Sequence, residues 1–143
     1  MKKTVYAALF ILIAACNDTD NSQTSTSIAA PEGPKPVGYS VLNTYLHDTS
    51  SFTQGLAIYN GKLYEGTGEY GHSSLLQVDL INGKIQKKIP LDAKYFGEGI
   101  TILHDTIFQL TWKENVVFAY TIKDLKKVNE FKINTEGWGI TTN

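Results

Sequence analysis

Three residues that can do chemistry recur at near-regular intervals in the sequence. Gln54, Glu98 and Trp138 each precede a glycine, and 44 and then 40 residues separate them. A carboxyl group can take up and release a proton, an amide can donate and accept hydrogen bonds, and an indole has an apolar face and one N–H donor. If the fold brings them together, they form a site that can bind a polar group and move protons on it. The elements that carry them decide whether they meet.

From about Tyr39 onward the sequence predicts short antiparallel strands and no amphipathic helix. Runs of β-branched and aromatic residues are separated by turn dipeptides such as Asn60-Gly61, Asn82-Gly83 and His104-Asp105. Asn-Gly favours a type I′ hairpin turn because both residues tolerate positive φ angles. We therefore expect an all-β domain.

The predicted strands form an internal repeat. Each copy begins with Gln54, Glu98 or Trp138 and the glycine that follows it. In the two full copies this start belongs to the first of two strands joined by a turn, and two later strands follow. The first two strands lie at residues 54–58 and 63–67 in the first copy and at 98–102 and 107–111 in the second. The third copy is represented by its first strand, at residues 138–142. The later strands lie near 75–80 and 85–89 in the first copy, and near 116–122 and 127–133 in the second. Four strands in 40 to 44 residues are typical of a β-propeller blade, with a small sandwich or another meander as the alternative.

Propeller geometry predicts a shared site. The innermost strand of each blade lines the central channel, so equivalent positions converge near the axis. Gln54, Glu98 and Trp138 would then face one cavity. A structural position would be expected to keep one residue type in every repeat, so the change from amide to carboxylate to indole favours a functional cavity. Variation at a solvent-exposed position would give the same pattern.

Composition narrows the functional classes. The chain of 143 residues has a formal net charge of -1, and all its basic residues are lysines, so we do not expect nucleic-acid binding. Its single cysteine, Cys16, excludes an intramolecular disulfide. His47, His72 and His104 lack the spacing of metal ligands. We expect these histidines at the surface or in turns, and we expect no metal or other cofactor.

The first residues predict export and lipid anchoring. Two lysines precede an apolar run over residues 5–15, which is too short for a lasting transmembrane helix. The run ends in Ile13-Ala14-Ala15-Cys16, which matches the lipobox of bacterial lipoproteins. Attached acyl chains would hold the protein at a membrane, so we expect it in the bacterial cell envelope. An ordinary signal peptide followed by a chance cysteine is the alternative.

These patterns divide the chain into three parts. Residues 1–15 are predicted to be a lipoprotein signal peptide. Residues 16–38 are rich in Asn, Asp, Ser, Thr and Pro, and we expect them to form a lipidated, disordered tether. Residues 39–143 are predicted to form part of a β-propeller, with two blades and the start of a third.

Within the third part, several segments resemble the plant-type glutaminyl-peptide cyclotransferases, also called glutamine cyclotransferases. Tyr-Phe-Gly-Glu-Gly is the most specific of them. The similar segments are Phe52-Thr53-Gln54-Gly55-Leu56, Leu63-Tyr64-Glu65-Gly66-Thr67-Gly68 with Tyr70-Gly71, Tyr95-Phe96-Gly97-Glu98-Gly99-Ile100-Thr101, Gln109-Leu110-Thr111-Trp112 and Gly137-Trp138-Gly139-Ile140. The resemblance implies a five-bladed β-propeller that converts the N-terminal glutamine of a peptide into pyroglutamate and releases ammonia.

The resemblance also implies a role for each matching residue. Glu98 corresponds to the family's acid–base glutamate, Gln54 to its channel glutamine, and Trp112 and Trp138 to two tryptophans that line the substrate pocket. The family pattern also has an asparagine, a third tryptophan and a lysine in later blades. This sequence contains no match to those blades. The implied partners are peptides or proteins with N-terminal glutamine and, through Cys16, a membrane; we expect a monomer.

Each assignment has a structural alternative. Glu98 would be a solvated carboxylate at a strand end, Gln54 a turn or strand hydrogen-bonding group, and the two tryptophans core residues. Glu65, which shares a repeat position with Gln109, is expected to face water.

At the level of function, two other hypotheses stay open beside the cyclotransferase. One is a surface propeller that binds peptides or glycans without chemistry. The other is a polypeptide with two blades and exposed sheet edges that lacks a stable fold.

Overall fold

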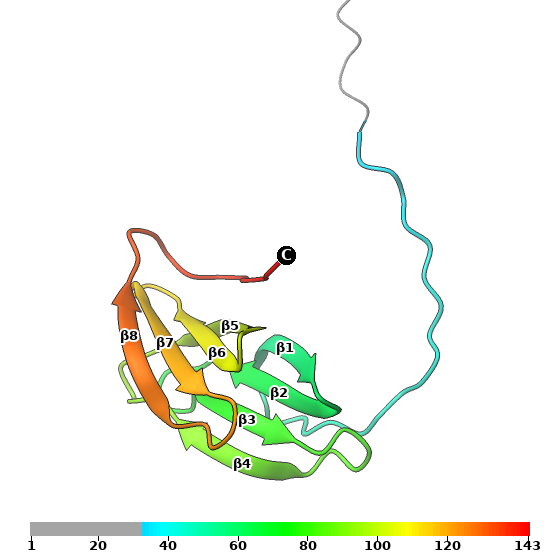
Figure 1. Ribbon diagram of the computed structural model, residues 1–143, viewed down its shortest axis with the longest axis horizontal. Coiled ribbons are helices and arrows are strands. Elements are labelled where there is room, and N and C mark those ends of the chain that lie inside the picture. The colour runs from blue at the N-terminus through cyan, green and yellow to red at the C-terminus, as the bar shows by residue number, and fades with distance from the viewer. Residues whose placement is uncertain (1–32) are drawn as a thin grey trace, which may run out of the picture. The chain divides into compact units, whose positions relative to one another are not determined.

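Two antiparallel four-stranded sheets follow one another along the chain in a computed structural model that describes residues 33–143 (Figure 1). The first sheet contains β1 (Thr53–Tyr59), β2 (Lys62–Thr67), β3 (Ser74–Val78) and β4 (Ile85–Pro90). The second contains β5 (Gly97–Leu103), β6 (Thr106–Thr111), β7 (Val116–Thr121) and β8 (Lys127–Lys132). Both lie in the compact unit Ser40–Asn143. The predicted signal peptide, Cys16 and most of the predicted tether fall outside the described residues.

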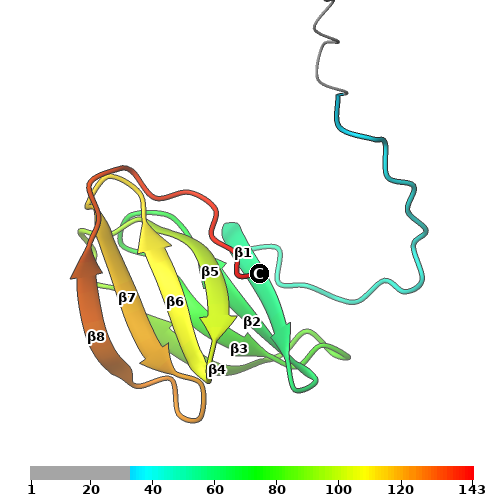
Figure 2. The ribbon, with the colours of Figure 1, turned by 45° about the horizontal axis from the view of Figure 1, so that its top comes forward.

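The strands of each sheet are neighbours in the order in which they occur in the sequence, as Figure 2 shows. This order confirms the prediction of two successive four-stranded repeats. The β1–β2 hairpin turns through Asn60 and Gly61, with φ angles of 49° and 72°, and the β5–β6 hairpin through His104 and Asp105, with 46° and 58°. Positive φ at both central residues is the requirement of a type I′ turn, so turn chemistry sets these two registers.

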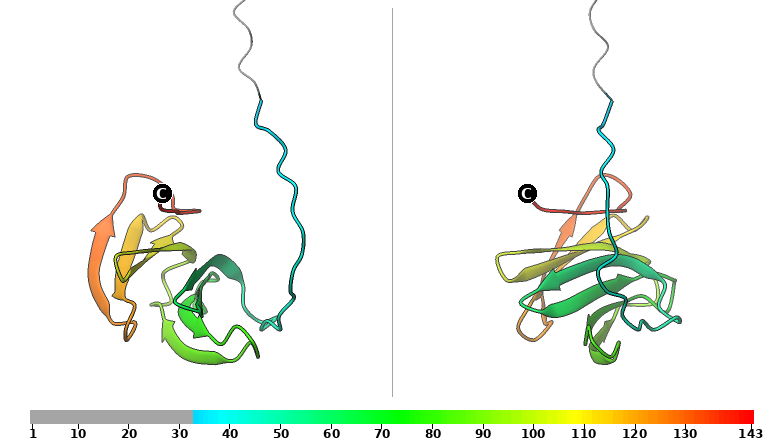
Figure 3. Two further views of the ribbon diagram at one scale, coloured as in Figure 1. Left: turned by 45° about the vertical axis from the view of Figure 1, so that its right-hand side comes forward. Right: turned by 90° about the vertical axis from the view of Figure 1, so that its right-hand side faces the viewer.

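The main core lies between the two sheets, which Figure 3 shows as separate layers. Buried side chains from β2 and β3 meet buried side chains from β5, β6 and β7. The cluster consists of Tyr64, Leu75, Ile100, Ile107, Val116, Phe118, Tyr120 and Leu125. Because each sheet buries its apolar face against the other, the contact between blades supplies most of the apolar burial.

The innermost strands of the two sheets, β1 and β5, lie side by side (Figure 1). The fourth strands, β4 and β8, are at the other edge of each sheet, and almost all their side chains are exposed. This is the arrangement expected of two neighbouring propeller blades, and it brings the start of β1 next to the start of β5.

The third copy of the repeat differs from the prediction. Residues 138–142 form no strand, because no antiparallel partner for them is present in the described part of the chain. The main chain still lies where an inner strand would lie, since the Gly99 N–H donates to the Trp138 carbonyl at 2.8 Å. Within residues 33–143 no helix is long and apolar enough to span a bilayer.

Candidate functional site

Gln54 and Glu98 both lie at an irregularity of an inner strand. On β1 the pairing passes from Thr53 to Gly55 while β2 advances by one residue, so Gln54 is the extra residue of a bulge. On β5 the register shifts between Gly97 and Ile100, which places Glu98 at the matching irregularity. A bulge redirects a side chain and is frequent beside active sites. In this protein it turns both polar side chains out of the regular alternation of their strands.

The two side chains meet. Gln54 Nε2 donates to Glu98 Oε1 at 3.4 Å, a long hydrogen bond. Only 4% of Glu98 is exposed, and among the described residues no lysine or histidine forms an ion pair with it. Burial therefore raises the pKa of the Glu98 carboxyl above its ordinary value. A carboxyl group in this environment is suited to hold a proton and to release it to a partner.

The two tryptophans also lie against each other. Trp112 follows β6, and its ring packs edge-to-face on Trp138 with 5.9 Å between centroids. The Trp112 Nε1–H donates to Glu136 at 3.2 Å, and the Lys113 ammonium lies 3.9 Å from the indole centroid. Trp112 is half-buried and Trp138 is 58% exposed, so neither belongs to the closed core. Both indoles can present a face to a ligand.

The main chain connects the Gln54–Glu98 pair to the Trp112–Trp138 pair. Gly99, which follows Glu98, donates its N–H to the carbonyl of Trp138. The structure thus brings together all four residues singled out in the sequence, as two contacting pairs joined by one backbone hydrogen bond. The arrangement combines a buried proton-transferring group, an amide that can orient a polar substrate, and two aromatic surfaces.

Comparison with known proteins identifies the family of the chain. The glutamine cyclotransferase family matches residues 8–143. The chain belongs to this family. It is 44% identical over 105 residues to a glutaminyl-peptide cyclotransferase of Arabidopsis thaliana. The match covers 71% of this chain and 32% of the Arabidopsis thaliana protein. The chain therefore spans about a third of the length of this relative.

A solved relative supports the same fold. The glutaminyl cyclase of Myxococcus xanthus is 28% identical, with a TM-score of 0.62 over 68% of this chain and 41% of that one. A hydrazine synthase of Kuenenia stuttgartiensis is 16% identical and has a TM-score of 0.54 over 73% of this chain and 29% of that one; this likeness concerns the fold alone. The prediction of a partial propeller of the cyclotransferase type is confirmed.

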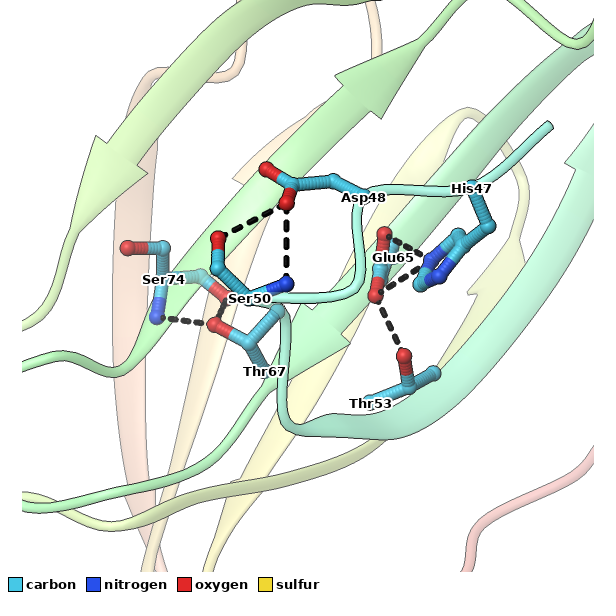
Figure 4. Close-up of polar contacts among 7 residues, drawn as sticks. All are labelled: His47, Asp48, Ser50, Thr53, Glu65, Thr67 and Ser74. Atoms are coloured by element: carbon cyan, nitrogen blue, oxygen red, sulfur yellow. Dashed lines mark hydrogen bonds and ion pairs between the residues drawn. The ribbon is translucent and has the colours of Figure 1, made fainter. Parts of the chain in front are cut away.

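One expectation about the site was wrong. Glu65 does not face water: it is 1% exposed. Its carboxylate accepts the Thr53 hydroxyl at 2.6 Å, and both its oxygens lie 3.1 Å from His47 Nε2 (Figure 4). His47 is exposed, as predicted for a surface residue, and its ring also contacts this cluster. The physical reason is that the segment before β1 lies over Glu65.

A sequence signal for this cluster existed. His47 lies 44 residues before Leu91, so the equivalent position of the second repeat has an apolar residue. The repeat therefore places His47 at a position that packs against a blade. The identity of its partner had no such signal, because 18 residues separate His47 from Glu65.

Other features of the described structure lie away from Glu98. A cleft of about 400 Å³ separates the segment before β1 from the first sheet, and Asp48, Ser50, Thr67, His72 and Lys88 are among its lining residues. Glu98 does not line it. Within residues 33–143 no three metal-ligating side chains are grouped closely enough to hold an ion.

Proposed function

We propose that the protein to which these residues belong is a glutaminyl-peptide cyclotransferase, and that Glu98 moves the proton in its reaction. The observation that carries this proposal is the buried Glu98 carboxyl, which has a raised pKa and contacts the amide of Gln54. Membership of the family and the relative from Arabidopsis thaliana support the choice of substrate.

The reaction needs one proton relay. The α-amine of the N-terminal glutamine attacks its own γ-carbonyl carbon, so a C–N bond forms and closes a five-membered lactam. Glu98 takes a proton from the attacking amine and gives it to the amide nitrogen, whose C–N bond then breaks to release ammonia. Gln54 orients the substrate amide, and the indoles of Trp112 and Trp138 favour the folded substrate conformer.

The proposal is tested with the intact gene product and peptides that begin with glutamine. Ammonia release and the matching loss of peptide mass are measured together. The same peptide with an acetylated α-amine is the control, because it has no free nucleophile. Pyroglutamate formed only from the free peptide supports the proposal. Peptide binding without turnover overturns it in favour of a non-catalytic binding propeller.

Trp138→Ala is expected to raise KM about fivefold and to change kcat little. One aromatic contact contributes roughly 1 kcal/mol, and about 1.4 kcal/mol corresponds to a factor of ten in affinity. Steady-state kinetics with a glutamine peptide measure this change. Phe131→Ala is the matched control, because Phe131 is a similarly exposed aromatic residue on the outer strand β8. An equal rise in KM in both variants would speak against a substrate contact at Trp138.

We also propose that the protein is anchored in the bacterial cell envelope through lipid at Cys16. The sequence Ile13-Ala14-Ala15-Cys16 after an apolar run supports this proposal. Cys16→Ala is expected to abolish the incorporation of labelled palmitate and to release the protein from the membrane fraction. If Cys16→Ala stays in the membrane fraction and carries label like the wild type, this anchor is wrong.

A further inference from the structure

Glu65 is a buried carboxylate that the proposed reaction does not use. It lies on β2, where its Cα partner on β1 is Leu56. Thr53, at the start of β1, donates its hydroxyl to Glu65, and His47 contacts both carboxylate oxygens from the segment before β1 (Figure 4). A carboxylate with 1% exposure is costly unless such partners satisfy it. The three residues therefore act as a single unit.

The second blade is built without this unit. At the positions 44 residues later, Leu91 replaces His47, Gly97 replaces Thr53 and Gln109 replaces Glu65. All three members differ together, and β5, β6, β7 and β8 still form the same four-stranded sheet. The blade architecture therefore does not require the cluster of His47, Thr53 and Glu65, which points to a local purpose in the first blade.

Both blades hold the residue before their inner strand by an equivalent main-chain hydrogen bond, from Gly68 N–H to the Phe52 carbonyl and from Trp112 N–H to the Phe96 carbonyl. The side-chain support of the bulge differs between them. In the second blade the Gly97 N–H donates to the Ser73 hydroxyl at 2.9 Å, and Ser73 belongs to the first blade. Gln109 Nε2 donates to the Ser74 carbonyl at 3.2 Å. The start of β5 is thus held by the preceding blade. The start of β1 is held through Thr53 by Glu65 of its own blade.

We propose that Glu65 is a positioning residue of the substrate pocket: through Thr53 and His47 it fixes the start of β1, and thereby the direction in which Gln54 leaves the bulge toward Glu98. Thr53 is the residue directly before Gln54, so a change at its side chain moves the bulge first. This inference rests on the proposed function, because it assigns Gln54 to the pocket.

The hydrogen bond between Gln54 and Glu98 is sensitive to small movements of the start of β1. Gln54 Nε2 and Glu98 Oε1 are 3.4 Å apart, which is longer than the usual N–H···O distance and close to the limit beyond which no hydrogen bond forms. A shift of a few tenths of an ångström at Thr53 is enough to break it. The loss of one hydroxyl on β1 is therefore expected to alter turnover without removing a group that touches substrate.

The test is a double-mutant cycle in the intact gene product. Thr53→Val keeps the size of the side chain and removes its hydroxyl, and Gln54→Ala removes the group that is positioned. Thr53→Val alone is expected to lower kcat about fivefold, the effect of one hydrogen bond, with KM little changed. In the Gln54→Ala background it is expected to have no further effect, because residues that act through each other are not additive.

Two further variants sharpen the cycle. Thr53→Ser retains the hydroxyl and is expected to keep wild-type kcat. Tyr59→Phe removes a hydroxyl at the other end of β1, where it donates to Asp105 at 2.5 Å, and is expected to leave kcat unchanged. If Thr53→Val is fully active, or lowers kcat by the same factor with and without Gln54, the inference is overturned.

Failure of the proposed function gives a different result. A wild-type protein that forms no pyroglutamate refutes the cyclotransferase proposal and leaves the geometry to be judged by crystallography. In that case, a Thr53→Val crystal structure with the Gln54 amide moved away from Glu98 supports the positioning role. An unmoved amide refutes it.

Discussion

Glu98→Gln in the intact gene product is expected to lower kcat/KM for pyroglutamate formation by about 10²- to 10⁴-fold, the usual contribution of a general acid–base group. Glutamine has the size of glutamate and can still contact Gln54, but it can neither take up nor release the reacting proton. In the proposed reaction one carboxyl acts on both substrate nitrogens in turn, and the side chain that hydrogen-bonds to Glu98 in the described chain is the amide of Gln54, which cannot take over the proton transfer. Initial rates of ammonia release measure the loss.

The same substitution is not expected to destabilise the fold at neutral pH. Burial raises the pKa of Glu98 above the ordinary value of 4.5, so the folded state binds this proton more tightly than the unfolded state. The associated stability is fully present below the unfolded pKa and is lost as the pH rises through the folded pKa. Glu98→Gln carries no charge and escapes this loss, so its free energy of unfolding relative to the wild type should increase with pH across that window.

Two measurements separate chemistry from folding in this experiment. Urea unfolding at several pH values gives the stability difference, and Glu130→Gln on the exposed outer strand β8 is the matched carboxylate control. Glu130→Gln should retain the activity of the wild type. A Glu98→Gln protein with wild-type kcat/KM would remove Glu98 from the reaction, and an activity loss that follows unfolding would assign it a structural role.

Much of the fold was predictable because its signals are local. Asn60-Gly61 and His104-Asp105 specify their hairpins through positive φ angles, and the repeat then fixes the number of strands in each blade. The convergence of inner strands predicted that Gln54 and Glu98 face one cavity, and their side chains lie in contact. The pattern could not predict the bulges that aim these side chains, because a bulge depends on how two strands pair rather than on the composition of either one.

The error at Glu65 has the same origin. Its position in a strand gives only the face on which it lies, and burial of that face depends on the segment that covers it. His47 covers it from 18 residues away, and that contact is set by tertiary packing. The polar type of Glu65 favoured solvent exposure, but a buried carboxylate with two fixed partners satisfies the same physical requirement.

Gly99→Ala is expected to lower the free energy of unfolding by about 3 kcal/mol, at the upper end of the usual cost of overpacking. An added Cβ at Gly99 would lie 2.5 Å from the Trp138 carbonyl oxygen and 3.1 Å from the Gly139 Cα. Both neighbours are main-chain atoms, which cannot rotate away as a side chain can. The methyl group would therefore push the segment around Trp138 away from β5. This movement would break the hydrogen bond from the Gly99 N–H to the Trp138 carbonyl, which joins the Gln54–Glu98 pair to the two tryptophans.

A second glycine separates this clash from simple backbone strain. Gly61 lies in the β1–β2 turn with a φ of 72°, and an added Cβ there would meet nothing within 4 Å. Gly61→Ala is therefore expected to cost only the strain of a left-handed conformation, about 1 kcal/mol, and to leave kcat/KM unchanged. Gly99→Ala should lose stability and activity together, measured by urea unfolding and by turnover at a temperature where both variants are folded. Equal stability losses at the two positions would mean that the close main-chain contact at Gly99 adds nothing to the cost of replacing a glycine. The packing of the Trp138 segment against β5 would then be looser than the structure has it.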